Sequence, residues 1–261
     1  MKPPIQSLKK GVLNPIKSTR KTAPALCETA IFSSYYQALE TARRDHRPVA
    51  LLGHSGYGKT VTIQKFKSDF PTTTVVTLNI VARQPRALLY LIQKALNLKV
   101  WHSKLNCVIL DEIANALRES PRLLVLDEMH LASWEAWELV RALHDSAGIG
   151  IAVAGQPRMY DTMYVGGTRD YLYDQILSRI SLSVSFEAIA PDDIQLFAES
   201  VWPGLDKACV GFLTEEGNHH GGFRRVGLIL EWAIRLAQDQ DIPIDHRLLR
   251  RVTQILADRQ Y

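Results

Sequence analysis

The sequence has no apolar run close to the roughly 18 residues that a membrane-spanning helix needs, and no apolar segment of a secretory signal follows its first lysines. These absences predict a cytoplasmic protein without a membrane partner. Cysteine is scarce, because only Cys27, Cys107 and Cys209 occur, without the spacing of a metal site, which favours buried reduced thiols. With 261 residues and a hydrophobic content of 46%, the chain can still build a full core.

Acidic residues are missing from the first 21 positions, which carry six lysines and arginines. Three prolines and a glycine prevent a long helix there, so residues 1–27 are expected to form a flexible basic arm. The other 240 residues hold 25 basic and 27 acidic side chains, a net charge of −2. A basic arm on a near-neutral body indicates a polyanion partner, with nucleic acid the first candidate, although an arm that only promotes solubility is the alternative.

The central feature of the sequence is an octapeptide between an apolar strand at 48–52 and a helical stretch at 60–70. It matches G-x-x-x-x-G-K-[ST] and consists of Gly53, His54, Ser55, Gly56, Tyr57, Gly58, Lys59 and Thr60. In this pattern the backbone N–H groups surround phosphates, and the following helix adds the partial positive charge of its N-terminus. The lysine reaches the β- and γ-phosphates and the threonine binds Mg²⁺. The octapeptide predicts a nucleotide site; the alternative is an ordinary glycine-rich turn.

A second apolar strand, at 123–126, ends in Asp127 and Glu128. Acids at the carboxyl end of a buried parallel strand indicate an active site, where Asp127 would hold Mg²⁺ through its water shell and Glu128 would polarise the attacking water. A cap on the next helix is the alternative. A second acid favours hydrolysis over phosphotransfer, because a kinase activates an acceptor hydroxyl instead. The chain lacks the Asn-Lys-x-Asp motif that reads guanine, so ATP is expected rather than GTP.

The order of elements predicts an α/β domain with a parallel five-stranded sheet flanked by helices. Further strands are expected at 73–78, 150–154 and 182–186, and helices at 33–45, 85–97, 105–119, 133–146 and 170–178. Beyond Pro191 the pattern becomes purely helical, with helices expected at 191–201, 206–216, 223–237 and 245–258. This shift predicts a nucleotide-binding domain at 28–189 and a small helical lid domain at 190–261.

The ordered set of motifs resembles that of AAA+ ATPases over residues 28–258. The set comprises the octapeptide, Asp127-Glu128, the polar strand end at Gln156, Ser-Arg-Ile around Arg179, and Gly222-Phe223-Arg224-Arg225. Within AAA+ proteins, the chain is similar to the DNA-transposition regulators, the MuB-like, TnsC-like and TniB-like ATPases. The segments that carry this likeness are Val125–His130, Gly148–Gly155 and Ile229–Arg235.

The resemblance implies roles for four further side chains. Gln156 would be the sensor 1 residue, Arg179 the arginine finger that acts on a neighbouring subunit, and Arg225, or its neighbour Arg224, the sensor 2 residue. Sensor 1 is more often Asn or Thr in this family, so the longer Gln156 departs from the pattern. The phage protein of this group also carries a separate N-terminal DNA-binding domain, whereas only about 28 residues precede the expected core here.

In this group, DNA is gripped by elements between the second and third strands, on the inner face of a ring or helical oligomer. That region offers five polar side chains that would contact phosphates without reading bases, although each could equally belong to a solvated surface. They are Arg83, Arg86, Lys99, Ser103 and Lys104.

The resemblance implies an ATP-dependent regulator that oligomerises on duplex DNA and recruits or activates a transposase at target DNA, with slow, regulatory ATP hydrolysis. Its partners would be double-stranded DNA, further copies of itself, a transposase and a target-selection protein. One alternative is a secretion- or replication-associated AAA+ ATPase of the same clade. Another is a P-loop phosphotransferase, against which the helical lid and Arg179 both argue.

Overall fold

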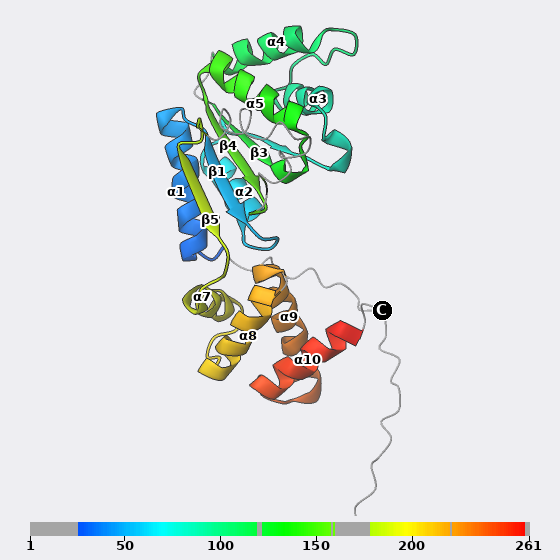
Figure 1. Ribbon diagram of the computed structural model, residues 1–261. Coiled ribbons are helices and arrows are strands. Elements are labelled where there is room, and N and C mark those ends of the chain that lie inside the picture. Colours follow the sequence, from blue (N-terminus) through cyan, green and yellow to red (C-terminus); the bar gives the residue numbers. More distant parts are fainter. Residues whose placement is uncertain (1–25, 119–121, 158, 160–177, 220, 259–261) are drawn as a thin grey trace, which may run out of the picture.

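The computed structural model describes residues 26–118, 122–157, 159, 178–219 and 221–258. Its centre is a five-stranded sheet in the order β2-β3-β4-β1-β5, and every neighbouring pair of strands is parallel (Figure 1). The strands are β1 (Val49–Gly53), β2 (Thr74–Thr77), β3 (Leu123–Asp127), β4 (Gly150–Gly155) and β5 (Leu182–Phe186). The predicted parallel sheet of five strands is therefore confirmed.

The central strands are buried on both faces, as their unbroken apolar sequences predicted. Because side chains alternate along a strand, each strand contributes to two separate cores. In β3, Leu123 and Val125 join one hydrophobic cluster, whereas Leu124 and Leu126 join the other. The sheet is thus held from both sides, and its carboxyl ends are fixed with it.

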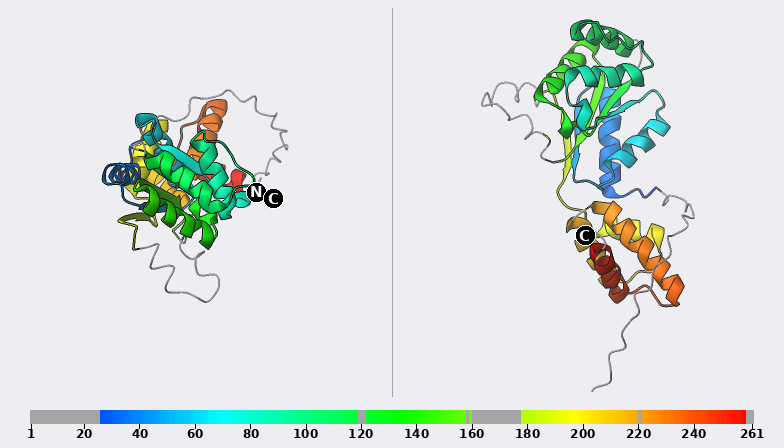
Figure 2. Two further views of the ribbon diagram at one scale, coloured as in Figure 1. Left: turned by 90° about the horizontal axis from the view of Figure 1, so that it is seen from above. Right: turned by 90° about the vertical axis from the view of Figure 1, so that its right-hand side faces the viewer.

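Helices cover both faces of the sheet (Figures 1 and 2). One face packs against α1 (Ala30–Asp45) and α2 (Lys59–Asp69). The other packs against α3 (Pro85–Ala95), α4 (Asn106–Arg118) and α5 (Trp134–Ala147). Two short 3-10 turns, η1 (Ile80–Ala82) and η2 (Met129–Leu131), follow β2 and β3. The helix predicted at 170–178 lies outside the described residues except for Ser178, which is in a turn.

Helix α1 begins three residues earlier than its pattern predicted. Thr29 caps it by accepting a hydrogen bond from Phe32 N at 3.1 Å. The carboxylate of Asp193 also accepts from Ala30 N at 2.7 Å, and this residue is 163 positions away in the sequence. The local pattern could not include that distant carboxylate, which is why the predicted start was late.

The C-terminal region is helical, as predicted, and consists of α7 (Pro191–Val201), α8 (Lys207–His219), α9 (Gly222–Gln240) and α10 (His246–Asp258). These helices gather at the end of the sheet where β1 runs into the octapeptide (Figures 1 and 2). One hydrophobic cluster continues from the α1 face of the sheet into them. A domain boundary at 189/190 therefore stays a prediction.

Two of the remaining composition-based expectations can be compared with the structure. Within the described part of the chain, no helix is both long enough and apolar enough to cross a membrane. All three cysteines are free, but only Cys209 is buried; Cys107 is exposed on α4, so the expectation of three buried thiols is wrong for it. The basic arm up to residue 25 lies outside the described residues.

Candidate nucleotide-binding site

The octapeptide forms the connection between β1 and α2, the strand-loop-helix arrangement that its pattern predicted. Lys59 opens α2 and lies back across the loop, where its Nζ donates to the carbonyl oxygens of Gly53 at 2.6 Å and His54 at 3.1 Å. The side chain is largely buried, with 8% of the residue exposed. The ammonium group is therefore held at the mouth of the loop, where phosphate oxygens can replace the two carbonyls.

The environment of Lys59 acts on its charge in two directions. Burial is the larger effect and lowers the pKa of the ammonium group, while the carboxylates of Asp127 and Glu128 act to raise it. Arg224 lowers it further. A negatively charged ligand would offset both the burial and the repulsion from Arg224, so this pocket favours an anion.

Thr60 and Asp127 meet at the loop, although 67 residues separate them in the sequence. Thr60 Oγ1 donates to Asp127 Oδ2 at 2.9 Å, and the other carboxylate oxygen accepts from Glu128 N at 2.9 Å. Asp127 is 1% exposed, and its carbonyl accepts from Leu78 N at the end of β2. Hydrogen bonds thus fix both the carboxylate and the main chain of Asp127 beside the predicted phosphate site.

The pair of Thr60 and Asp127 fits a magnesium ion. A hydroxyl and a carboxylate oxygen are the hard ligands that Mg²⁺ prefers, and this ion usually takes one or two of them together with substrate phosphates. Among the residues that the structure describes, no cluster of three or more His, Cys, Asp or Glu side chains is arranged to hold a metal alone. The arrangement is therefore suited to an ion that arrives with a nucleotide.

Glu128 follows in an unusual backbone conformation. Its φ of 62° and ψ of 33° lie in the left-handed region, which non-glycine residues seldom adopt and which is found preferentially at functional sites. Its carboxylate stays 41% exposed, and Oε2 lies 3.3 Å from Nδ1 of His130. The side chain is thus accessible to a water molecule while its backbone is tightly constrained.

Gln156 directly follows β4, which lies between β1 and β3 in the sheet. Gln156 is exposed, and its backbone carbonyl oxygen accepts a hydrogen bond from Met159 N at 2.9 Å. Because the carboxyl ends of parallel strands share one edge, Gln156 lies at the same edge as the octapeptide and Asp127. This position agrees with the predicted sensor role, which stays a prediction.

The two neighbouring arginines of α9 have different surroundings. Arg224 Nη1 donates to Ser55 Oγ within the octapeptide at 3.3 Å. Arg225 instead forms an ion pair with Glu216 of α8, with Nη2 and Oε2 3.2 Å apart. Arg225 was the first choice for the nucleotide contact, but the geometry favours Arg224 because only this neighbour contacts the loop among the described residues.

Helix α9 approaches the octapeptide backbone to backbone. Phe223 N donates to Gly56 O at 3.0 Å. Gly56 has a φ of +86°, and a Cβ atom there would lie 1.9 Å from the carbonyl oxygen of Gly221. A Cβ atom on Gly222 would in turn lie 2.7 Å from the backbone of Gly56. This close contact requires glycine on both sides, and it joins the C-terminal helices directly to the loop.

Arg179 lies at the other end of the sheet from the octapeptide. It precedes β5 beside Pro48, at the amino end of β1, and the five residues of β1 span about 16 Å at the usual rise per residue. Its guanidinium group donates to both carboxylate oxygens of Asp145 on α5, at 3.0 and 3.1 Å. Arg179 is therefore remote from the loop of its own chain.

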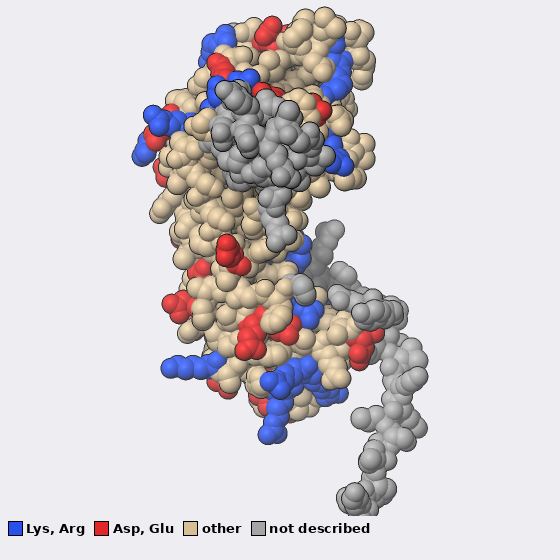
Figure 3. Space-filling model, in the orientation of Figure 1, with Lys and Arg blue, Asp and Glu red and all other residues tan. Residues whose placement is uncertain are grey.

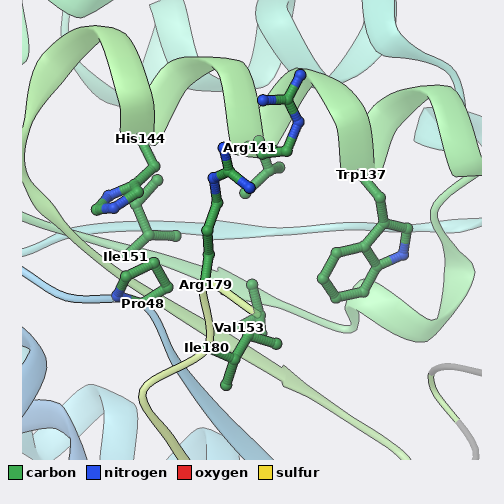
Figure 4. A pocket seen from close by; sticks show the side chains of 9 residues that line it. Pro48, Trp137, Arg141, His144, Ile151, Val153, Arg179 and Ile180 are labelled. Carbon is green, nitrogen blue, oxygen red and sulfur yellow. The ribbon is translucent and has the colours of Figure 1, made fainter. Parts of the chain in front are cut away.

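A pocket adjoins Arg179 between α5 and the sheet (Figure 4). Arg141 reaches the same Asp145 at 2.9 Å, and the buried ring of Trp137 lines the pocket (Figure 4). These cations hold the pKa of Asp145 below its usual range, mainly through the hydrogen bond from Arg179. The guanidinium group of Arg179 is thereby kept in one orientation at the surface.

Two side chains of α3 anchor the α3–α4 loop, residues 96–105. Arg86 donates to the carbonyl oxygens of Trp101 and Lys104, both at 2.7 Å. Gln93, which is 1% exposed, donates to the carbonyl oxygen of Lys99 at 3.0 Å. Arg86 was predicted to contact DNA, yet its guanidinium group is engaged in shaping this loop.

The loop presents Trp101 with a lysine on either side of it in the sequence. The ammonium groups of Lys99 and Lys104 lie 4.0 and 3.8 Å from the centre of the indole ring. Lys104 is also paired with Glu112 of α4, whereas Lys99 and Ser103 are exposed. Arg83, the fifth predicted contact, is exposed before α3. Four of the five side chains therefore belong to this loop or contact it, whereas Arg83 precedes α3, and the five are not equally available.

In the view of Figure 3, the charged side chains of one sign do not gather on one side of the molecule. On that face, lysine and arginine side chains are interspersed with aspartate and glutamate. This agrees with the small net charge of the chain outside its first 21 residues. A single subunit therefore offers a polyanion only local groups of cations on this face.

Several residues that support the site were missed by sequence reasoning. Tyr35 of α1 is fully buried and donates to Leu52 O at 2.7 Å, immediately before the octapeptide. Asn218 of α8 accepts from Ile189 N at 2.7 Å and donates to its carbonyl, which fixes the chain after β5. Asp145 and His130 belong here too. His130 ends a segment that carries the family resemblance but was given no role, and the other three lie in no motif, so their spatial contacts reveal them.

Comparison with known proteins supports the assignment of this fold. The family model for the AAA domain matches residues 42–163, which include the octapeptide, Asp127, Glu128 and Gln156. A curated relative is the Mu-like prophage FluMu DNA transposition protein B of Haemophilus influenzae, which is 28% identical over 203 residues. The match covers 77% of this chain and 70% of that protein.

Solved structures with the same fold include Cdc6p from Pyrobaculum aerophilum, with a TM-score of 0.63 and 19% identity over 84% of this chain. The Aeropyrum pernix ORC1 protein in complex with DNA has a TM-score of 0.61 and 14% identity over 90% of this chain. The chain spans 66% of the length of each of these two structures. Residues 42–163 of the chain thus match an AAA domain, and the chain is similar in sequence to a Mu-like DNA transposition protein B.

Proposed function

We propose that this protein is an ATPase that assembles on duplex DNA and recruits or activates a transposase there. The observation that carries the ATPase part is the contact of Thr60 with the buried Asp127, which joins the octapeptide to the acidic end of β3. The DNA and transposition part rests on the sequence relationship to a DNA transposition protein B. The domain division at 189/190 belongs to the same proposal.

In this mechanism the octapeptide binds the phosphates of ATP through its backbone N–H groups, and Lys59 pairs with the terminal phosphates. Thr60, and Asp127 through its water shell, would hold Mg²⁺, and this ion would neutralise developing charge on the phosphates. Arg224 adds a second positive charge from α9. Its contact with Ser55 supports this role, and the proposal assigns sensor 2 to Arg224.

Glu128 acts as the base that takes a proton from the attacking water. Its carboxylate is accessible and next to the buried Asp127, which supports the assignment. Gln156 lies at the same edge of the sheet, where its amide can bind the γ-phosphate or the water. Slow, regulated turnover belongs to the same proposal.

The oligomer in this proposal is a ring or helix in which Arg179 of one subunit serves the nucleotide site of the next. Arg179 is about one strand length away from its own loop, so it can supply transition-state charge only to another copy. The bidentate ion pair with Asp145 supports this by holding the guanidinium group at the surface.

The DNA contact is made by phosphate-binding side chains around the α3–α4 loop, chiefly Lys99, Ser103 and Arg83, with the basic arm adding charge. Few cations are available on one subunit, so a single copy should bind weakly. An assembly that forms with ATP places many such loops on one duplex and gains affinity through effective concentration. Many weak contacts along one duplex would therefore let a chain with a nearly neutral body bind DNA.

ATP turnover with and without duplex DNA tests this proposal. We expect duplex DNA to stimulate hydrolysis by the wild-type chain at low salt, and Glu128→Gln to bind ATP and DNA with turnover lowered by about 10² or more. A phosphotransferase would ignore the DNA. Turnover that is unchanged by duplexes of any length, at a salt concentration of about 50 mM where phosphate contacts are strong, would reject the proposed function.

A further inference from the structure

The turn that carries Glu128 is short and runs from β3 to α5. After Glu128 it forms η2, and Ser133 then caps α5, with its Oγ 3.4 Å from Ala136 N. A left-handed backbone at a glutamate persists only when the surrounding structure fixes it. The contacts that fix this turn therefore determine where the carboxylate of Glu128 lies.

Two kinds of contact hold the turn. Within it, Glu128 N donates to Asp127 Oδ1 at 2.9 Å and Leu131 N donates to Glu128 O at 3.0 Å. From outside, Arg83 binds its far end twice. Arg83 Nε donates to Leu131 O at 3.1 Å, and the carbonyl oxygen of Arg83 accepts from Ser133 N at 2.9 Å.

Arg83 belongs to a different and more exposed part of the chain. It follows η1, in which Ile80 is 64% and Val81 84% exposed, and it leads into α3. The same residue was predicted to contact DNA phosphates. One exposed guanidinium group is thus both a predicted DNA contact and, through its Nε, a hydrogen-bond donor to the turn that carries Glu128.

We infer that Arg83 is a positioning residue for Glu128, acting through the hydrogen bond from its Nε to Leu131 O. This inference rests on the proposed ATPase function, and it assigns Arg83 a task that does not require DNA. A guanidinium group has five N–H donors, so the Nη groups of Arg83 can bind a DNA phosphate while its Nε keeps the contact with Leu131 O.

Three substitutions at Arg83 separate positioning from DNA binding. Arg83→Lys keeps the positive charge that a phosphate needs but loses the planar Nε donor. Arg83→Gln keeps an amide N–H donor but loses the charge. Arg83→Ala loses both. The measurement is kcat and ATP affinity without DNA, with Arg250→Ala, an exposed arginine on α10, as the matched control.

We expect Arg83→Ala and Arg83→Lys to lower kcat about tenfold or more without DNA, since small displacements of a catalytic group are costly. Arg83→Gln should recover part of the loss, and ATP affinity should change little in all three. If Arg83→Lys turns over ATP at the wild-type rate, the inference is wrong while the proposed function stands. If the wild-type chain hydrolyses no ATP, both are wrong.

A double substitution guards against general damage to the fold. If Arg83 acts through Glu128, then adding Arg83→Ala to Glu128→Gln should slow the residual turnover no further, because residues that act as one unit are not additive. A further loss of the size seen with Arg83→Ala alone would overturn the inference.

Discussion

The two groups of candidate residues in this protein are held in different ways. The octapeptide and Asp127 are fixed by backbone geometry and by a buried side-chain contact at the edge of the sheet. The cations proposed to act on DNA or on another subunit lie nearer the surface, and four of them are already engaged with carbonyl or carboxylate groups of their own chain. These are Arg83, Arg86, Lys104 and Arg179.

This difference shows what determines the availability of a charged side chain. A phosphate loop functions through main-chain groups, so its sequence pattern specifies its geometry. The role of a surface arginine depends on its neighbours in space. The carbonyl groups that occupy Arg86 lie 15 and 18 residues along the chain, and the carboxylate that orients Arg179 lies 34 residues away. Tests of the two groups should therefore give different results for similar substitutions.

The largest effect is expected for Arg179, the surface cation proposed to act on another subunit. If Arg179 acted within its own chain, the contrast between the two groups of residues would not hold. Arg179→Ala should lower turnover by about 10³, the scale of an arginine finger. Mixing it with Lys59→Ala protein should restore part of the activity, because a mixed interface can combine an intact Lys59 with an intact Arg179. Failure of every mixing ratio, while the two variants still co-assemble, would contradict action on a neighbour.

Substitutions at Lys59 and Glu128 test whether different residues of the nucleotide site serve ATP binding and ATP hydrolysis. Lys59→Ala should weaken ATP binding and assembly together, whereas Glu128→Gln should bind ATP normally and lose turnover by about 10² or more. ATP binding by calorimetry and phosphate release provide the two measurements. Equal losses of ATP binding in both variants would make Glu128 a structural residue.

The neighbours Arg224 and Arg225 form a comparison of their own within α9. Arg224→Ala should weaken ATP binding about tenfold or more, since hydrogen bonds from charged donors contribute about 1.5–3 kcal/mol. Arg225→Ala should instead lower the free energy of unfolding by about 1 kcal/mol, because Glu216 loses its partner at a partly exposed site. Titration of ATP and thermal unfolding distinguish these outcomes, and the reverse pattern would restore Arg225 as the nucleotide contact.

Most of the fold and the backbone part of the site could be predicted from the sequence. The octapeptide, the strand ending in Asp127 and the helical C-terminal region follow from local patterns. The pairing of Arg224 with Ser55, across 169 residues, could not be derived, because it depends on how α9 packs against the loop. The same holds for Asp145, whose partner Arg179 lies 34 residues later.

The contact between α9 and the octapeptide predicts unequal costs for two glycine substitutions. Gly56→Ala and Gly148→Ala both place a Cβ at positive φ, which costs about 1–2 kcal/mol. Only Gly56→Ala adds a clash with a backbone oxygen, since nothing lies within 4 Å of a Cβ on Gly148. Thermal unfolding should show the larger loss for Gly56→Ala. Equal losses of stability in the two variants would mean that α9 moves away from the octapeptide without lowering the free energy of unfolding.

The smallest expected effect distinguishes Lys99 from Lys104. Lys99→Ala should reduce the slope of log K against log salt by roughly 0.9 per subunit if Lys99 neutralises one phosphate. Lys104→Ala should change the slope less, because Glu112 already neutralises that ammonium group. DNA binding at several salt concentrations provides the slopes. A larger change for Lys104 would show that the ion pair breaks on DNA.

The most direct test of the account is retention of duplex DNA by the full chain with ATP or with ADP, at increasing salt. The account predicts sequence-independent retention with ATP at about 50 mM salt, a steep loss towards about 200 mM, and little retention with ADP. Absence of retention with ATP at about 50 mM salt would contradict the account, and would favour an AAA+ protein that acts on another protein instead.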